Sequence, residues 1–444
     1  MSCNIGALDR MVMNFGAGSP FASAATPDPT SPALFVSNAP EQIGEGVYPN
    51  ELDTPEFDWR QGAWTFGTGS RNLCQAQISQ NMPTRVRVFF WHITRFSVPS
   101  YWAVLVKSGP ESTISNIKIQ VPGPDIPNPS GDLSGLGNCL AAAHLMGTLD
   151  AQPGGVISIS NETIVWSRAM GAGTMVHNSF SHIAAIIEFD VNATEFFNIR
   201  SVVSITGQSV QDFSNSPPNV SPLADNQNNF GPFNVRHNRG YWDHSDIFLP
   251  LAPEFNCTLW APTAPITKEW SICDANSPED QYFSKGHSRA AHFFDYPLPP
   301  APPIDRERNN TAAYGANLIY SCPYHNFSND TLGRFYIGLR ARNVGGPYFG
   351  AARLSTMSPS PEVFGIPGKV TPLASSVPAF TNHRFVDLTS QYPAPVPMGY
   401  VVVGPSETGI VRLRLANGGG ATTPVNIQFR RDMVDQNPNQ GGPG

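Results

Sequence analysis

The stretch Thr84–Lys107, TRVRVFFWHITRFSVPSYWAVLVK, limits the possible folds more than any other part of this chain. Its first half alternates with a period of two, which is the period of a β-strand and not that of a helix. One side of this strand would carry apolar residues, histidine and threonine from Val86 to Val98. The other side has arginines at its ends, Arg85, Arg87 and Arg95, around an apolar middle of Phe89, Trp91 and Ile93.

A strand that is apolar on both faces suits the middle of a large sheet, covered on both sides or lying against a neighbouring subunit. Pro99 ends the ladder because proline has no N–H to donate. A second apolar run then begins at Tyr101–Val106. We therefore predict the core of a large β-sandwich, in which this stretch serves packing and not chemistry.

The composition predicts many turns and no long helices, because the chain has 43 proline and 39 glycine residues and only 14% charged residues. With 40% hydrophobic residues and 27 phenylalanines, it can nevertheless build real cores. Its 444 residues exceed one sandwich and fit two modules plus an arm, at roughly 100 to 200 residues per domain.

Short apolar runs separated by Gly, Pro and Asn clusters predict antiparallel sandwiches in both halves. In the first half, besides the stretch above, these runs are Ala63–Phe66, Ser115–Val121, Val156–Trp166, His182–Val191 and Ile199–Val210. A short helix is expected over Leu133–Leu149, with Leu136, Leu140 and Ala143 on one face and Ser134 as its cap. In the second half the runs are Asp246–Leu251, Cys257–Trp260, Thr267–Cys273, Leu318–Cys322, Arg334–Arg342, Tyr400–Val403, Ile410–Leu415 and Val425–Phe429.

These runs divide the chain into five parts. We expect an extended N-terminal arm over 1–55, a first β-sandwich of jelly-roll type over 56–211, a linker or long loop over 212–240, a second sandwich or projection domain over 241–432, and a flexible tail over 433–444. The arm is too weakly apolar to fold alone, so we expect it to dock on a neighbour or inside an assembly. A disordered tail is the alternative.

The net charge of −7 argues against nucleic-acid binding by the whole surface. The first 58 positions contain only Arg10 against eight carboxylates, so the arm is not basic. Arginines outnumber lysines by 22 to 5, which is typical of subunit interfaces, although simple compositional bias explains the ratio equally well.

Six scattered cysteines without any CxxC pair indicate free thiols and no zinc knuckle or redox pair. No run of about 18 apolar residues predicts a membrane span, and no secretory leader is visible.

The sequence offers few groups for chemistry. His237, Asp243, His244 and Asp246 could hold a metal ion, but seven positions separate the two histidines and would place them on opposite faces of a strand, which favours a hydrogen-bonded loop cluster. The pairs His177/His182 and His287/His292 are five apart, which fits neither a strand face nor a helix face, so structural or exposed roles are expected.

A glycosidase needs only two carboxylates, so Glu188, Asp190, Glu195 and Asp243 stay open as candidates. Phenylalanine outnumbers tryptophan plus tyrosine, 27 against 8 plus 12, which favours core packing over a sugar platform. We assign no catalytic, cofactor-binding or metal-binding residue and expect no enzyme activity and no cofactor.

Two short segments and the overall texture resemble the capsid proteins of small icosahedral viruses, especially the picorna-like group. The segments are Met13–Pro20 in the arm and Pro424–Met433 near the C-terminus, and the texture is that of β modules rich in Pro, Asn, Thr and Phe. The resemblance implies a jelly roll that tiles into a closed shell in the virion, alone or with sister chains, with the arm inside and a host receptor or glycan as a further partner.

The chain departs from the many capsid proteins that carry an arginine-rich arm. The resemblance therefore implies that RNA contact is slight, or uses scattered arginines, or belongs to another chain. Two alternatives stay open: a β-rich carbohydrate-binding or glycoside-processing protein, and an adhesin that forms trimers or fibres.

Overall fold

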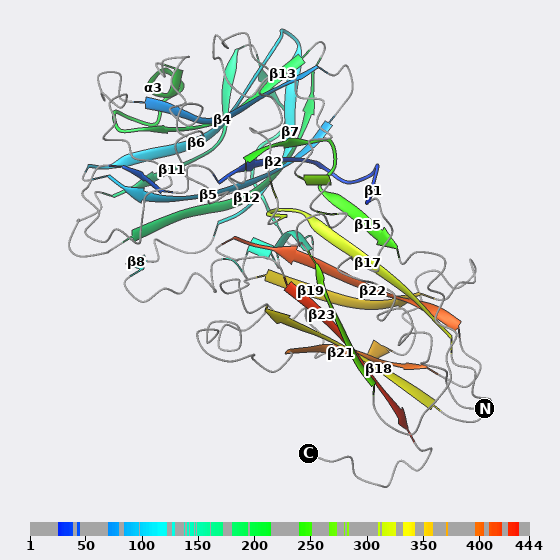
Figure 1. The fold of residues 1–444 in the computed structure, drawn as a ribbon. Coiled ribbons are helices and arrows are strands. Elements are labelled where there is room, and N and C mark those ends of the chain that lie inside the picture. Colours follow the sequence, from blue (N-terminus) through cyan, green and yellow to red (C-terminus); the bar gives the residue numbers. More distant parts are fainter. Residues whose placement is uncertain are drawn as a thin grey trace, which may run out of the picture.

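A computed structural model describes the chain over 25–38, 42–44, 70–79, 84–96, 98–121, 127–128, 149–159, 161–171, 180–193, 196–214, 239–250, 266–272, 313–325, 332–341, 350–357, 370–371, 396–403, 408–419 and 425–434, and at 137, 140, 141, 143–145, 147, 279, 282, 283 and 310. These residues form two β-sandwich modules of jelly-roll type, drawn at the upper left and lower right of Figure 1.

The first module pairs a nine-stranded sheet with a four-stranded sheet. The larger sheet has the order β10-β7-β12-β5-β2-β14, with β3 on β5, β8 on β12 and β9 on β7. Its strands are β2 (Ala33–Ser37), β3 (Gln42–Gly44), β5 (Thr84–Arg95), β7 (Ser112–Gln120), β8 (Pro127–Asn128), β9 (Asp150–Ala151), β10 (Ile157–Ile159), β12 (Phe180–Asn192) and β14 (Arg239–Trp242). The smaller sheet has the order β11-β6-β13-β4, with β4 (Ser70–Ser79), β6 (Ser100–Ser108), β11 (Glu162–Met170) and β13 (Phe196–Ser204).

Successive long strands of this module alternate between the two sheets. From β4 to β7 each strand changes sheet, and β11, β12 and β13 do the same. This alternation is the connectivity of a jelly roll, in which each face of the core receives strands from the whole length of the module.

The second module repeats the alternation with two five-stranded sheets. One has the order β1-β15-β17-β22-β19 and contains β1 (Thr26–Pro27), β15 (Asp246–Pro250), β17 (Asn317–His325), β19 (Gly350–Met357) and β22 (Thr408–Asn417). The other has the order β16-β23-β18-β21-β20 and contains β16 (Ile266–Ile272), β18 (Leu332–Ala341), β20 (Val370–Thr371), β21 (Val396–Val403) and β23 (Val425–Val434). Figure 1 shows these two sheets lying one over the other.

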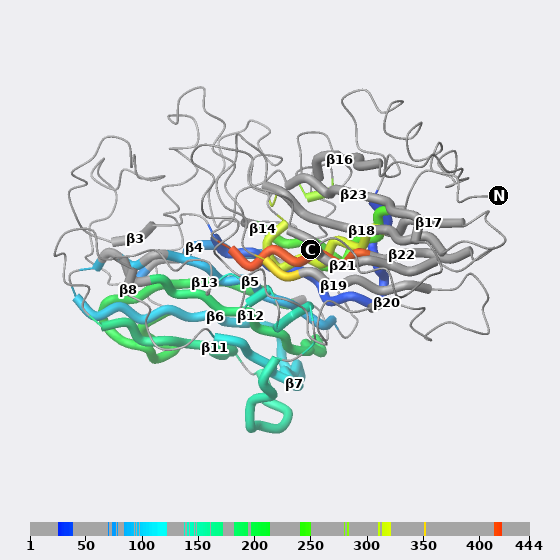
Figure 2. The backbone as a smooth tube through the Cα atoms, turned by 90° about the horizontal axis from the view of Figure 1, so that it is seen from below, coloured from blue at the N-terminus to red at the C-terminus, as the bar shows by residue number. Residues whose placement is uncertain are grey.

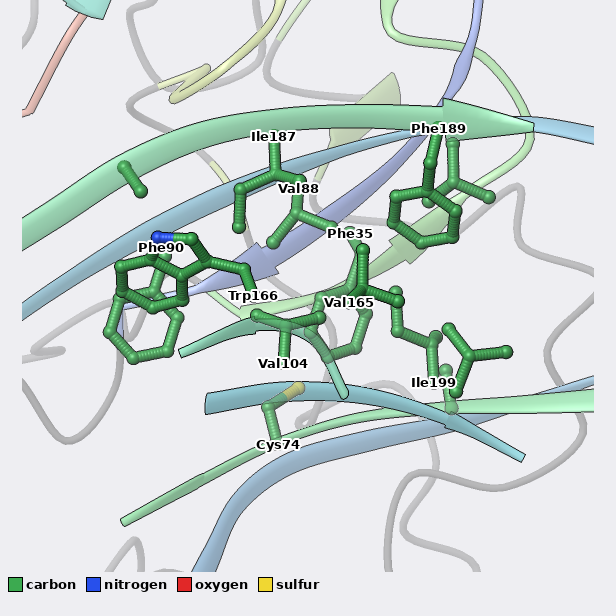
Figure 3. Packing of buried hydrophobic residues seen from close by; sticks show 14 of the residues in the cluster. Phe35, Cys74, Val88, Phe90, Val104, Val165, Trp166, Ile187, Phe189 and Ile199 are labelled. Atoms are coloured by element: carbon green, nitrogen blue, oxygen red, sulfur yellow. The ribbon is translucent and has the colours of Figure 1, made fainter. Parts of the chain in front are cut away.

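The core of the first module lies between its two sheets, as Figure 3 shows. Val88, Phe90 and Ile187 point inward from the larger sheet and meet Val104 and Ile199 from the smaller one. All five side chains are fully buried, which is what the period of two in the sequence predicts for the inner face.

The only helix with defined bounds in the described residues is α3 (Val210–Ser214), which covers the outer face of the four-stranded sheet. Phe213 packs there on Ala103, Leu105 and Val202. Beneath it Arg200 of β13 bonds Glu162 of β11 at 2.5 Å and donates to the Phe213 carbonyl at 3.2 Å.

Several elements differ from the sequence predictions. The expected strand Val156–Trp166 is two strands, β10 and β11, which belong to different sheets. The expected strand Ile199–Val210 ends at Ser204, and α3 begins at Val210. In both cases the predicted strand was too long. The apolar residues valine and isoleucine also follow the turn, so the pattern gave no sign that the strand ends there.

Part of the expected arm belongs to the chain's own fold. β2 is completely buried and pairs in parallel with β5 and antiparallel with β14, while β1 pairs with β15. For residues 33–37, docking on another subunit is therefore wrong. Of the arm, the structure describes only 25–38 and 42–44. The predicted strands Ala63–Phe66 and Cys257–Trp260, most of the linker and nearly all of the tail also lie outside the described residues.

The described residues contain no helix long and apolar enough to cross a membrane. Cys74 is buried in the first core and forms no disulfide bond, and Figure 3 shows it beneath Val104 and Trp166. Figure 2 shows the loop between β9 and β10 projecting from the first module.

Candidate functional site

On the outer face of β5, which points away from the first core, polar and charged groups of the described residues converge. Its register on β12 pairs Arg85 with Asp190 and Arg87 with Glu188. Farther along the same face come Phe89 and Trp91, both buried. Charge therefore lies at one end of the face and aromatic surface in the middle.

Arg87 is the centre of a buried ion-pair network. Its Nε donates to Glu188 Oε1 at 2.7 Å, and its Nη1 donates to Asp246 Oδ1 at 3.0 Å and to the Gly315 carbonyl at 3.1 Å. Its side chain is only 5% exposed. Burial opposes the charge on Arg87, but Asp246 and Glu188 outweigh it and raise the pKa of the guanidinium.

Asp246 is the first residue of β15 and brings the second module into this network. Its Oδ2 accepts from Asn317 at 2.9 Å, and Ser245 donates to its Oδ1 at 2.8 Å. Burial alone would raise the pKa of this carboxyl, but Arg87 and the hydrogen bonds lower it. Arg87 and Asp246 are thus both charged at neutral pH, and they link β5 to β15.

His144 lies beside this network on a helical segment. Burial, reinforced by the charge of Arg87, lowers its pKa to about 3, so the imidazole is neutral at pH 7. The same segment packs Ala141 and Leu145 on Ala351 and Ala416 of the second module. The helix expected within 133–149 therefore forms in part, and it lies against the second module.

The aromatic middle of the face is covered by the same chain. Phe89 stacks on Tyr314 with ring centroids 5.1 Å apart, and Trp91 meets His182 at 5.6 Å. Burial lowers the pKa of His182 to about 4. The sequence allows this strand face to be covered either by the same chain or by a neighbouring subunit. In the structure, the same chain covers Phe89 and Trp91.

The charged end of the face opens into a cleft of about 860 Å³. It is lined by Pro29, Thr30, Ser31, Ala33, Thr84, Arg85, Thr113, Ser115, Asp190, Val191, Asn192, Tyr241, Asp243 and His244. On its wall Arg85 Nε donates to Asp190 Oδ1 at 3.2 Å, and Asn116 donates to Asp190 Oδ2 at 2.7 Å.

The metal-binding hypothesis receives no geometric support from the described residues. Asp246 is held by Arg87, whereas Asp243 and His244 line the cleft, and His237 lies outside the described residues. No group of three or more His, Cys, Asp or Glu side chains in the described part of the chain could hold a metal ion.

Three of the four carboxylates left open for glycoside hydrolysis lie in the described residues, in two different places. Glu188 is bound to Arg87 in the buried network, while Asp190 and Asp243 share the cleft. Glu195 lies outside the described residues, as do His177, His287 and His292.

Sequence reasoning also missed a serine–histidine cluster in the first core. Ser37 Oγ lies 2.8 Å from His92 Nε2 and 2.7 Å from Ser201 Oγ, and all three residues are fully buried. A nucleophile must reach its substrate, so this cluster is a polar bridge between the two sheets and not a catalytic pair. In the sequence, the one sign of this cluster was His92, a histidine on a mostly apolar strand face.

No family model matches the chain, and no curated protein matches it. Among solved structures, procruciferin, an 11S globulin from Brassica napus, shows 9% identity over 84% of this chain and 88% of its own, with a TM-score of 0.13. An 11S globulin from Wrightia tinctoria shows 11% identity over 81% and 83%, with a TM-score of 0.10. Likeness this weak carries no argument about fold or function, so the β-sandwich assignment depends on the strand topology itself.

Proposed function

We propose that this chain is a structural subunit that self-assembles into a closed shell, as the resemblance to small icosahedral capsid proteins implies. The observation that carries the proposal is the alternation of strands between two sheets in both modules. Two jelly rolls in one chain make a large building block with several edge strands, and edge strands can pair with neighbours.

The edge strands of the four-stranded sheet support this proposal. β4 and β11 are 10 and 9 residues long and end the strand order on either side, with no further described strand paired beyond them. Long edges invite pairing with other chains unless they are covered. An assembly in which neighbouring subunits cover β4 and β11 would remove that hazard.

The junction between the modules also supports a structural role. Arg87, Glu188 and Asp246 are consumed in holding β5, β12 and β15 together, so they are not free for chemistry. A subunit of a closed shell must present its contact surfaces at fixed angles. A buried charged network between modules provides that rigidity.

The described surface bears few exposed apolar side chains, with Val98 at 38% and Val156 at 67% as the large ones. At the described surface, contacts with a neighbour would therefore be made by backbone pairing and polar groups more than by apolar patches. Salt screens contacts between charged side chains but not backbone pairing, so the response of assembly to ionic strength distinguishes these two kinds of contact.

The test is electron microscopy and analytical ultracentrifugation of the full chain at low and physiological salt. Closed particles, or a steep concentration-dependent growth in mass, are the expected result. A monodisperse monomer at high concentration would overturn the proposal, and fibres would favour the adhesin alternative.

A pair of variants locates the contact. Ser167 and Ala169 are exposed on the edge strand β11, so S167K and A169K place charges along it without touching the core. We expect these variants to fold but to lose assembly. The control G155K adds the same charge in the exposed loop after β9 and should assemble as the wild type does.

The glycoside-processing alternative predicts a different outcome. Asp190 would have to serve as an acid, a base or a nucleophile, although Arg85 and Asn116 already bind both of its oxygens. Hydrolysis of an oligosaccharide that is lost in both Asp190→Asn and Asp243→Asn would establish that alternative.

A further inference from the structure

Arg85 stands in the cleft as an anchored side chain with donors to spare. Its Nε is fixed by Asp190 Oδ1 at 3.2 Å, while 59% of the side chain is exposed. The described residues give its two terminal amino groups no other partner. An arginine held at one nitrogen loses little further rotamer freedom when a ligand binds the other two.

Asp190 is fixed beside it from two sides. Arg85 binds Oδ1, Asn116 binds Oδ2 at 2.7 Å, and the side chain stays 27% exposed. Each carboxylate oxygen has lone pairs for more than one hydrogen bond. The cleft wall therefore presents a preorganised acceptor directly next to preorganised donors.

The remaining lining determines which ligands this pair can accept. Hydroxyl groups come from Thr30, Ser31, Thr84, Thr113 and Ser115, and an amide comes from Asn192. One guanidinium stands against the carboxylates of Asp190 and Asp243, so the lining carries one more carboxylate than guanidinium. Such a lining repels phosphates, sulfates and carboxylates.

A neutral ligand with many hydroxyl groups matches both the adjacent donors and acceptors of the cleft and its excess of negative charge. Every hydroxyl donates one hydrogen bond and accepts others, so neighbouring hydroxyls can accept from Arg85 while they donate to Asp190. The volume of about 860 Å³ lies within the range of small-molecule sites, and the exposed Pro29 offers apolar contact for ring C–H groups.

We propose that this cleft binds a neutral oligosaccharide, with Arg85 and Asp190 holding adjacent hydroxyl groups of one sugar ring. The site uses β2, β5, β7, β12 and β14 and the segments before β2 and after β14, and none of its lining residues lies on the edge strands β4 and β11. Binding and assembly should therefore be separable, and the proposal does not depend on shell formation.

The experiment is a printed array of neutral, acidic and basic oligosaccharides probed with the full chain, followed by calorimetric titration of the strongest neutral binder. Arg85→Gln and Asp190→Asn should each weaken that binding by at least about tenfold, because each removes a charge-assisted hydrogen bond. Since the Arg85–Asp190 pair is partly exposed, both variants should melt as the wild type does. Lys107→Ala removes an exposed cation on β6, outside the cleft, and should leave the affinity unchanged.

Three results would overturn the proposal: no neutral oligosaccharide bound by the wild type, a preference for acidic or basic ligands, or wild-type affinity in both cleft variants. Particle formation by Arg85→Gln and Asp190→Asn would separate this site from the assembly edges. Loss of particles in both variants, with binding intact, would place these residues in a subunit contact and count against a ligand site.

Discussion

Arg87 joins segments that are far apart in the sequence. Its partners Glu188, Asp246 and Gly315 lie 101, 159 and 228 positions away. No local spacing predicts such contacts, so the sequence showed a charged end on a strand but not the residues that neutralise it. The pairing became visible only once the two modules were placed against each other.

Replacing Arg87 by methionine keeps the side-chain volume but leaves two carboxylates without their cation. Glu188 and Asp246 are only 16% and 15% exposed. Breaking a buried ion pair from one side costs about 3 to 5 kcal/mol, so Arg87→Met should lower the free energy of unfolding by that amount. Urea unfolding measures it.

Arg85→Met is the matched comparison, two positions along the same face. Its ion pair with Asp190 is exposed, with side-chain values of 59% and 27%, and exposed pairs contribute about 0 to 1 kcal/mol. Equal losses in the two variants would contradict the view that burial makes the Arg87 network strong.

His182 provides a prediction about pH. Burial lowers its pKa from 6.5 to about 4, so the unfolded chain binds a proton that the folded chain does not over this interval. The contribution of the neutral His182 to the free energy of unfolding is fully present above pH 6.5 and is lost as the pH drops toward 4. His182→Phe keeps an aromatic ring on Trp91 and should reduce that slope by up to about 1.4 kcal/mol per pH unit.

Urea unfolding of both proteins at several pH values between 4 and 7 provides the measurement. His144, whose pKa is lowered to about 3, contributes to the slope in both proteins and cancels in the difference. Parallel curves for the wild type and His182→Phe would mean that His182 is not held neutral.

Among the elements, the long alternating strands were predictable and the connecting ones were not. β5, β12 and β22 show a clear period of two. β2 is only five residues long, ALFVS, and is buried on both faces, so it has no alternation to detect. The jelly-roll connectivity follows from pairing between distant strands and is not written in any one of them.

The cleft was predictable only in part. Asp190 and Asp243 were recognisable as carboxylates on or beside strands, but nothing in their spacing places them in one depression. Arg85 was visible as the charged end of the central strand. Its partner Asp190 depends on the antiparallel register of β5 and β12, which sequence alone does not fix.

The segments that cover β5 approach it through glycine. Gly315 has a φ of +71°, and a Cβ there would lie 2.8 Å from the Cβ of Phe89. Gly315→Ala should therefore destabilise the protein through both backbone strain and overlap, by about 2 to 5 kcal/mol.

Gly147→Ala isolates the strain from the overlap. Gly147 has a similar φ of +66°, but an added Cβ would meet nothing within 4 Å. Gly147→Ala should lower the free energy of unfolding by only about 1 kcal/mol, which is the cost of a positive φ alone. If thermal unfolding shows the same loss for both variants, the close approach between Gly315 and Phe89 is not tight.

The two modules are held together by contacts that differ in kind. The Arg87 network is ionic, the stacking of Phe89 on Tyr314 is apolar, and the β1–β15 pairing is made by backbone hydrogen bonds. An N-terminal segment that pairs with both modules, through β1 and β2, adds a covalent tie. Modules joined in this way should not open independently.

We therefore expect one cooperative unfolding transition for the whole molecule. Hydrogen exchange measured by mass spectrometry along a urea series should give the same midpoint for peptides from β5–β6 and from β22. In Arg87→Met the junction loses its only buried cation among the described residues, so the two midpoints should separate. Without the Arg87 network, the unfolding of one module removes less stabilising contact from the other, so the two modules are less strongly coupled. Two midpoints in the wild type would mean that the modules behave as independent domains, and the rigid geometry on which shell assembly depends would have to come from contacts between subunits.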